Sequence, residues 1–264
     1  VRAVTDRPLR IAWLVYRGYS EELGLSKLLD FTQGRDNSIR WRFRVPFGQG
    51  RAARLDVRAI MPPDRNAVRL LFSRLPDPSP ENLLADLDAV RLILRPDVED
   101  RSFHDVTKAF AGPEKTWPGA IIPLPRGVVF RPAPERALRL AVNTGEFTRE
   151  PEWRYMVGRP LEAERGLDPD SDLFSPGYFT IPLRAGQTVE LLAQILTPQE
   201  PDELPFLPAA VAAPPDADPD PVFPEREPLL DTLGRALRHY VVRRGSLKTV
   251  IAGYPWFLDW GRDT

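Results

Sequence analysis

The 264-residue chain has 36 basic and 37 acidic side chains, a formal net charge of −1 and 42% hydrophobic residues, which is the composition of an ordinary globular protein. This charge balance argues against a nucleic-acid partner, because proteins that bind the phosphate backbone usually gather a basic excess on one face. No apolar run approaches the roughly 18 residues of a membrane helix and no signal peptide is visible, so we expect a cytoplasmic protein without a membrane partner.

The chain has no cysteine and only two histidines, His104 and His239. The absence of cysteine excludes disulfides and thiolate metal sites. Two histidines so far apart in the sequence do not indicate a histidine-rich metal site either. We therefore expect no metal and no organic cofactor.

Most of the chain before about residue 197 has the pattern of short strands. The stretch Ile39–Val45 alternates apolar and basic side chains with a period of two, which places Arg40, Arg42 and Arg44 on one face of a strand. The simplest interpretation of this basic row is a face exposed to solvent. The other predicted strands, in chain order, are Ala53–Met61, Asn66–Leu75, Ala89–Pro96, Gly119–Leu124, Gly127–Pro132, Leu138–Asn143, Gly177–Leu183 and Thr188–Ile195.

Many short strands interrupted by Pro and Gly predict a mainly β fold, an antiparallel β-sandwich. Two stretches could instead form short helices, Leu23–Gln33 and part of Glu81–Val90. The stretch Asp168–Gly177 has acidic residues at alternate positions, as a calcium loop has, but lacks the central glycine and closing glutamate of that motif. A turn that leads into the strand at Gly177 is the better interpretation.

The composition changes sharply after about Thr197, where Pro, Ala and acidic residues predominate. Proline restricts φ and removes backbone donors, so this stretch predicts an extended linker. Beyond it, Pro228–Gly245 has apolar residues at three- and four-residue steps and predicts a helix. The sequence thus predicts three parts: a β-sandwich domain of residues 1–197, a linker of residues 198–227 and a helical region of residues 228–264.

The last thirteen residues, AGYPWFLDWGRDT (Ala252–Thr264), combine aromatic rings with charged side chains. A pyranose ring stacks its C–H faces on indole rings and binds guanidinium and carboxylate groups through its hydroxyls, so these residue types suit a sugar. The alternative is that the aromatic residues belong to a core and that Arg262 and Asp263 form a surface ion pair. Spacing alone leaves both interpretations open.

This tail resembles the signature of the prokaryotic amylo-α-1,6-glucosidase, or glycogen debranching enzyme, family at the entry to its (α/α)₆ barrel. Two upstream stretches, VRLILRPDVEDRSFHDVT (Val90–Thr107) and EWRYMVGRPLEAERGLDPDSDLFSPGYFTIPL (Glu152–Leu183), are similar to the N-terminal domain of that family. Separated motifs in the expected order are more specific than either alone. The resemblance implies a supersandwich-like antiparallel β-sandwich, a Pro-rich linker and the first helix of a truncated (α/α)₆ barrel.

The resemblance also implies roles for four residues of the tail. Arg262 and Asp263 align with an arginine–aspartate pair that, in related (α/α)₆ glycosidases, hydrogen-bonds the glucose of the −1 subsite. Trp256 and Trp260 match aromatic positions around the same subsite. Leu258 stands where the family more often has a small residue such as glycine, so the local packing of the subsite is expected to differ.

Inverting hydrolysis of a glycosidic bond needs two carboxyl groups about 6.5–9.5 Å apart. The resemblance implies that both lie downstream of Thr264, in the missing part of the chain's own (α/α)₆ domain. Asp259 and Asp263 are poor substitutes, because on a helical turn they would lie close together. We expect no catalytic residue within this chain and no activity of the chain alone.

The resemblance implies an enzyme that hydrolyses α-1,6-linked glucose from limit dextrin by inversion, with glycogen or α-glucan oligosaccharides as its ligands. A glucan-binding or scaffold sandwich is an alternative, and a binding sandwich would expose a coplanar platform of indoles. The indoles available for it are Trp13, Trp41, Trp117 and Trp153. Part of a glucoamylase-like exo-hydrolase is a further alternative.

The stretch RSFHD (Arg101–Asp105) could be taken for a catalytic pair of His104 and Asp105. Adjacent residues on a strand point to opposite faces, however, so the two side chains would be poorly placed for that chemistry. A structural or interdomain hydrogen-bonding role is the better interpretation.

Overall fold

The computed structural model describes residues 15–16, 19–20, 28–34, 38–62, 65–77, 79, 82–102, 105–202, 229–238, 240–244 and 246–251. The chain separates into two compact units, Val1–Pro219 and Asp220–Thr264. None of the helices in the described part is long and apolar enough to cross a lipid bilayer.

Antiparallel strands make up most of the described part of the first unit, and short helical turns connect some of them. The strands are β1 (Val15–Tyr16), β2 (Tyr19–Ser20), β3 (Leu28–Gln33), β4 (Ser38–Gly48), β5 (Arg51–Ile60), β6 (Ala67–Leu75), β7 (Val90–Leu94), β8 (Ile121–Leu124), β9 (Gly127–Ala133), β10 (Arg136–Val142), β11 (Glu146–Gly158), β12 (Asp170–Leu183) and β13 (Thr188–Leu196). The helical elements that the structure describes in this unit are η2 (Ala109–Ala111), α1 (Pro113–Thr116), η3 (Trp117–Ala120) and α2 (Pro160–Glu164).

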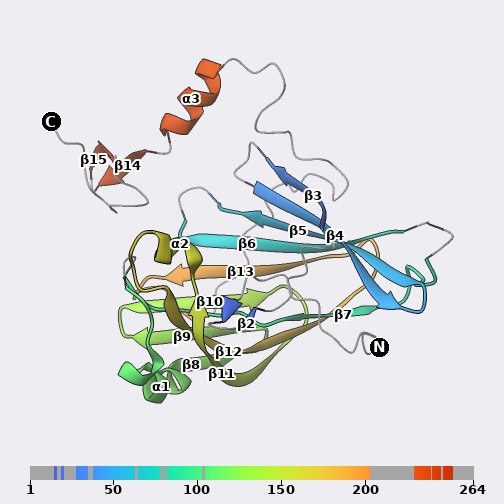
Figure 1. Cartoon of the computed structure of the whole chain (residues 1–264), viewed down its shortest axis with the longest axis horizontal. Helices are drawn as coiled ribbons and strands as arrows, with labels where there is room; N and C mark the ends of the chain where they lie inside the picture. The colour runs from blue at the N-terminus through green and yellow to red at the C-terminus, as the bar shows by residue number, and fades with distance from the viewer. Residues whose placement is uncertain are drawn as a thin grey trace. The chain divides into compact units, whose positions relative to one another are not determined.

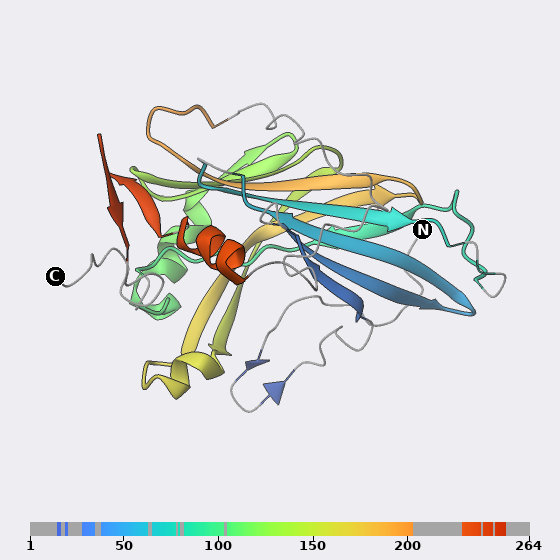
Figure 2. The same ribbon diagram turned by 90° about the horizontal axis from the view of Figure 1, so that it is seen from above.

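The strands form two sheets. One has eight strands in the order β3-β4-β5-β6-β13-β10-β9-β8, and the other has five in the order β2-β1-β11-β12-β7. Figure 1 shows β6, β13, β10 and β9 of the larger sheet one after another from top to bottom. In Figure 2 the end of the β11–β12 hairpin that carries α2 projects away from the larger sheet.

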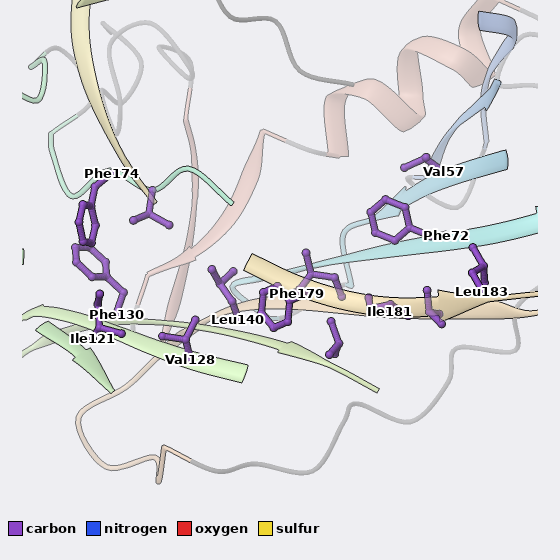
Figure 3. Close-up of a cluster of buried hydrophobic side chains, with 14 of the residues drawn as sticks. Val57, Phe72, Ile121, Val128, Phe130, Leu140, Phe174, Phe179, Ile181 and Leu183 are labelled. Carbon is purple, nitrogen blue, oxygen red and sulfur yellow. The ribbon is translucent and has the colours of Figure 1, made fainter. Parts of the chain in front are cut away.

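The hydrophobic core lies between the two sheets, as expected for a sandwich. Phe179, Ile181 and Leu183 point from β12 into this layer at period-two spacing, and none of them is exposed to solvent. Figure 3 shows these side chains in one cluster with Phe72 and Val57, which come from the larger sheet. The predicted mainly β sandwich is therefore confirmed.

The predicted strands correspond to β4, β5, β6, β7, β8, β9, β10, β13 and the second half of β12. The start of β12 was wrongly predicted as a turn. Asp170–Leu183 is one continuous strand of 14 residues, because the acidic start of this stretch pairs with the end of β11. Short polar side chains do not prevent a strand whose neighbours supply the hydrogen bonds and burial.

The two possible helices before residue 91 are also wrong where the structure describes them. Leu28–Gln33 is the edge strand β3. Residues 82–89 form irregular backbone with one turn and no helix. The Asn82 side chain accepts hydrogen bonds from the backbone N–H groups of Ala52 and Leu84 and donates one to the Ala52 carbonyl. An asparagine side chain that bonds nearby backbone in this way competes with helix formation.

The arginine row of β4 is not a solvated face. Arg40 is only 3% exposed and donates to Asp30 of β3 at 2.8 Å, and this hydrogen bond lowers the pKa of the Asp30 carboxyl. Arg42 makes two hydrogen bonds of 2.8 Å to the carboxylate of Asp56 on β5. The sequence pattern identified the shared face correctly, but neighbouring strands supply carboxylates that cover two of its three arginines.

The second unit contains α3 (Leu229–Arg238), β14 (Val241–Arg244) and β15 (Leu247–Val250). The predicted helix Pro228–Gly245 is therefore too long, because its last residues form a hairpin with β15. Two adjacent valines at the start of β14 suit a strand better than a helix. In the described part of α3, Leu230, Leu233 and Leu237 are all exposed.

Candidate functional site

The residues predicted for the −1 subsite, Arg262, Asp263, Trp256 and Trp260, lie outside the described residues. So does His104, the possible partner of Asp105. Their arrangement therefore stays a prediction. The candidate site that the structure does describe lies on the sandwich, at the end that carries α1.

A depression of about 520 Å³ adjoins α1. In Figures 1 and 2, α1 lies at the end of the sandwich opposite the turn that joins β4 and β5. The lining residues are Asp100, Arg101, Asp105, Val106, Thr107, Lys108, Ala111, Pro113, Trp117 and Asp168. Both stretches of the sandwich that resemble the debranching family contribute to this lining.

The start of β12 holds one wall of the depression in place. The Asp172 backbone N–H donates to the Thr107 carbonyl at 2.8 Å, and the Thr107 N–H donates to the Ser171 hydroxyl at 3.1 Å. The Asp172 carboxylate then accepts the Ala109 N–H at 2.8 Å. Segment 107–109 thus runs along β12, and buried hydrogen bonds hold it there, although the segment itself is not a strand.

The charged groups around the depression pair with one another over part of its rim. Lys108 lies 3.0 Å from the Asp168 carboxylate and donates to the Asp170 carbonyl at 2.6 Å. Arg101 donates to Glu99 at 3.1 Å and to the Asp105 carbonyl at 2.8 Å. Among the described residues, no group of three or more His, Cys, Asp or Glu side chains is arranged to hold a metal ion. The rim therefore offers individual hydrogen-bonding groups, some positively and some negatively charged.

Three aromatic rings stack outward from the depression. Trp117 lines it and stacks on Trp153 of β11, with ring centroids 5.2 Å apart and planes 22° apart. Trp153 stacks in turn on Tyr155, at 6.3 Å and 19°. Trp117 is 6% exposed, whereas Tyr155 at the outer end is 48% exposed. The series thus runs from the core to the surface.

A β-bulge in β11 places Tyr155 at the surface. Arg154 pairs with Leu173 and Val157 with Ser171, so Tyr155 and Met156 together oppose the single residue Asp172. Met156 has a φ of +56°, an unusual value for a residue other than glycine, and its N–H donates to the Asp172 carboxylate at 2.8 Å. The buried carboxylate therefore stabilises the bulge.

The Tyr155 hydroxyl donates to the Glu114 carboxylate of α1 at 2.6 Å. This hydrogen bond raises the pKa of the Tyr155 hydroxyl above its usual value, because loss of the proton would leave two negative charges in contact. The ring is thus held at its inner face by Trp153 and at its hydroxyl by Glu114.

The platform predicted for a glucan-binding sandwich was a set of coplanar exposed indoles. In the described part of the chain, Trp117 is buried, Trp153 lies between two rings, and Trp41 packs against the core. Tyr155, which was not predicted, provides an exposed ring at the outer end of this series. The spacing of Trp153 and Tyr155 indicates it, because residues two apart on a strand share a face.

The two-layer arrangement of antiparallel sheets places the first unit in the class of mainly β sandwich domains. Family models assign the chain more narrowly than this fold class does. The model described as glycogen debranching enzyme N terminal matches residues 4–190, and the model described as amylo-alpha-1,6-glucosidase matches residues 235–264. This chain belongs to the glycogen debranching enzyme family, a family of glucan-acting enzymes.

No curated protein matches the chain. One similar solved structure is a protein described as a kojibiose phosphorylase from human microbiome, with 9% sequence identity and a TM-score of 0.35. The similarity covers 70% of this chain and 21% of that protein. The chain therefore spans about a fifth of the length of this structural neighbour.

Proposed function

We propose that this chain is the N-terminal part of an amylo-α-1,6-glucosidase that removes α-1,6-linked glucose from a glycogen limit dextrin by inversion. The observation that carries the proposal is the match to the N-terminal debranching family over residues 4–190, followed by the match to amylo-alpha-1,6-glucosidase over residues 235–264. The order of the two matches agrees with the order of the sequence motifs. The proposed enzyme acts in the cytoplasm, where disulfides are rare. A chain without cysteine does not depend on disulfides for its stability.

In this proposal the parts of the chain have different tasks. Residues 1–197 form the supporting sandwich, residues 198–227 the linker, and residues 228–264 the first helix and substrate loop of the (α/α)₆ domain. The exposed leucines of α3 support this division, because an amphipathic helix of a barrel packs its apolar face against neighbouring helices of the same domain. The rest of that domain is thus the proposed partner of α3.

The tail supplies substrate contacts in this proposal. Arg262 and Asp263 hydrogen-bond hydroxyls of the glucose in the −1 subsite, and Trp256 and Trp260 form its aromatic walls. The acid and base carboxyls come from the remainder of the (α/α)₆ domain. The 264-residue chain alone therefore releases no glucose from limit dextrin.

The test uses a polypeptide in which this chain is followed by a complete amylo-α-1,6-glucosidase domain. Proton NMR of a limit-dextrin digest identifies the anomer that forms first, and inversion of an α-linkage yields β-glucose. Arg262→Ala should lower kcat/KM at least roughly tenfold, whereas Arg238→Ala on α3 should leave it near the parent value.

Two results would contradict the proposal. First release of α-glucose would exclude inversion. Faster release of glucose from linear maltoheptaose than from limit dextrin would instead favour the glucoamylase-like exo-hydrolase.

A further inference from the structure

We propose that the α1 end of the sandwich is a second contact surface for an α-glucan chain, separate from the −1 subsite of the tail. The outer face of Tyr155 stacks on a glucose ring, and the depression lined by Trp117 binds hydroxyls of neighbouring glucose units. The choice of α-glucan as the polymer rests on the proposed function. The surface itself rests on the geometry of the described residues.

Tyr155 has the properties of a preformed stacking platform. Trp153 covers its inner face, Glu114 binds its hydroxyl, and the ring is 48% exposed. A ring already held in place loses little conformational freedom when a ligand binds, so more of the stacking energy appears as affinity. The bulge at Met156 has a non-glycine residue at positive φ, and such backbone conformations cluster at functional sites.

The depression offers hydrogen-bonding groups suited to a neutral polyol. The Asp105 carboxylate is exposed and has no hydrogen-bond or ion-pair partner among the described side chains. Thr107 lines the same depression, and its hydroxyl is buried and lacks a hydrogen-bond partner in the described part of the chain. Sugar hydroxyls both donate and accept hydrogen bonds, so they match such a lining.

The charge of the lining disfavours an anionic ligand. Three aspartates and two basic residues line the depression, and the Lys108 ammonium already pairs with Asp168. A phosphate or nucleic-acid site would be expected to carry a basic excess. An uncharged glucan needs no such excess.

The ring series and the depression meet at α1 and share Trp117. Trp117 both lines the depression and begins the ring stack. Pro113 lines the depression, and the next residue, Glu114, binds the Tyr155 hydroxyl. A ligand chain that crosses α1 would therefore meet the stacking face and the hydrogen-bonding groups in succession.

Affinity electrophoresis of the whole 264-residue chain tests this inference. Migration is compared in native gels with increasing glycogen and in gels without it, beside a non-binding protein. We expect glycogen to retard the chain and Tyr155→Ala to raise the apparent Kd roughly five- to tenfold, as the loss of an aromatic stacking contact predicts. Phe31→Ala, at an aromatic residue that is 54% exposed on β3, is the matched control and should migrate like the parent chain.

Two further variants separate the contributions of the surface. Tyr155→Phe keeps the ring and should keep most of the retardation. Asp105→Asn should weaken retardation less than Tyr155→Ala, because an amide still bonds sugar hydroxyls. Far-UV and near-UV circular dichroism identify any variant that has lost its fold.

The inference is overturned if glycogen does not retard the parent chain, or if folded Tyr155→Ala is retarded as strongly as the parent. The proposed function would then still stand, because the anomer experiment tests it without reference to the sandwich. Retardation by xylan that maltoheptaose does not reverse would overturn the assignment of an α-glucan to this surface.

Discussion

Asp172 shows how one buried carboxylate joins segments that are distant in the sequence. Its two oxygens accept the backbone N–H groups of Met156 on β11 and Ala109 at the start of η2, each at 2.8 Å. The first contact stabilises the bulge that carries Tyr155, and the second stabilises the wall of the depression. Both parts of the candidate site therefore depend on this side chain.

Asp172→Asn should destabilise the chain by about 1–3 kcal/mol, because an amide offers one acceptor oxygen and turns an N–H group toward the second backbone donor. The free energy of unfolding in urea measures this change. Glu164→Gln, the same chemical change at an exposed residue of α2, should stay within about 0.5 kcal/mol of the parent chain. Equal unfolding midpoints for the two variants would contradict the bracing role of Asp172.

The raised pKa of Tyr155 determines how the contribution of this residue to the stability of the fold changes with pH. A raised pKa in the folded state means that folding favours the protonated phenol, so this contribution is present below the usual pKa near 10 and is lost as pH rises through the folded pKa. Tyrosinate absorbance, measured as the difference between the parent chain and Tyr155→Phe, follows this group alone. Glu114→Ala should shift its titration to lower pH, and Glu164→Ala should leave it unchanged. Identical titration of Tyr155 in the parent chain, in Glu114→Ala and in Glu164→Ala would show that Glu114 does not act on the phenol.

At the scale of elements, the β11–β12 hairpin needs glycine at one position. Gly177 has a φ of +149°, and a Cβ built there would lie 2.1 Å from the Thr148 carbonyl oxygen. Backbone atoms of the paired strand cannot move away as a flexible side chain can. The hairpin can therefore keep its register only with glycine at this position.

Gly177→Ala should lower the free energy of unfolding by about 2–4 kcal/mol, because the new methyl group would force the two strands apart. Gly119→Ala in η3 is the control, since a Cβ there meets no atom within 4 Å. This second change should alter stability by less than about 1 kcal/mol. Thermal or urea unfolding would distinguish them, and a neutral Gly177→Ala would mean that the strands can separate at low cost.

At the scale of the whole molecule, the sandwich has its own core. The buried residues of its main cluster lie between Phe43 and Leu191, all within the first compact unit. A domain with its own core can in principle fold alone. We therefore expect residues 1–202 to fold independently of the residues that follow.

A chain that ends at residue 202 should unfold in urea at the same midpoint as the 264-residue chain. The free energy of unfolding of this shorter chain should also fall with urea at the slope expected for a complete sandwich. This slope is proportional to the surface that becomes exposed on unfolding. A lower midpoint would show that the second unit contributes to the stability of the sandwich. The proposed boundary near residue 197 would then have to be revised.

The sequence by itself determined the mainly β class and the positions of most strands. Period-two alternation and breaks at Pro and Gly are local signals, and they can be read without knowing which strands are neighbours. The family was likewise readable from short motifs, because those motifs are contiguous in the chain. The predicted extent of α3 was less accurate, because residues 241–244 pair with β15 instead of continuing the helix.

Only the tertiary structure decided which side chains meet. The arginines of β4 are covered because β3 and β5 place Asp30 and Asp56 beside them. Tyr155 becomes a fixed platform because Glu114, 41 positions away in the sequence, reaches its hydroxyl. A periodic pattern identifies the face on which a residue lies, but the partner across that face depends on strand order and register. Burial and hydrogen bonding of a side chain are properties of such pairs, and for this reason they appear only in the folded chain.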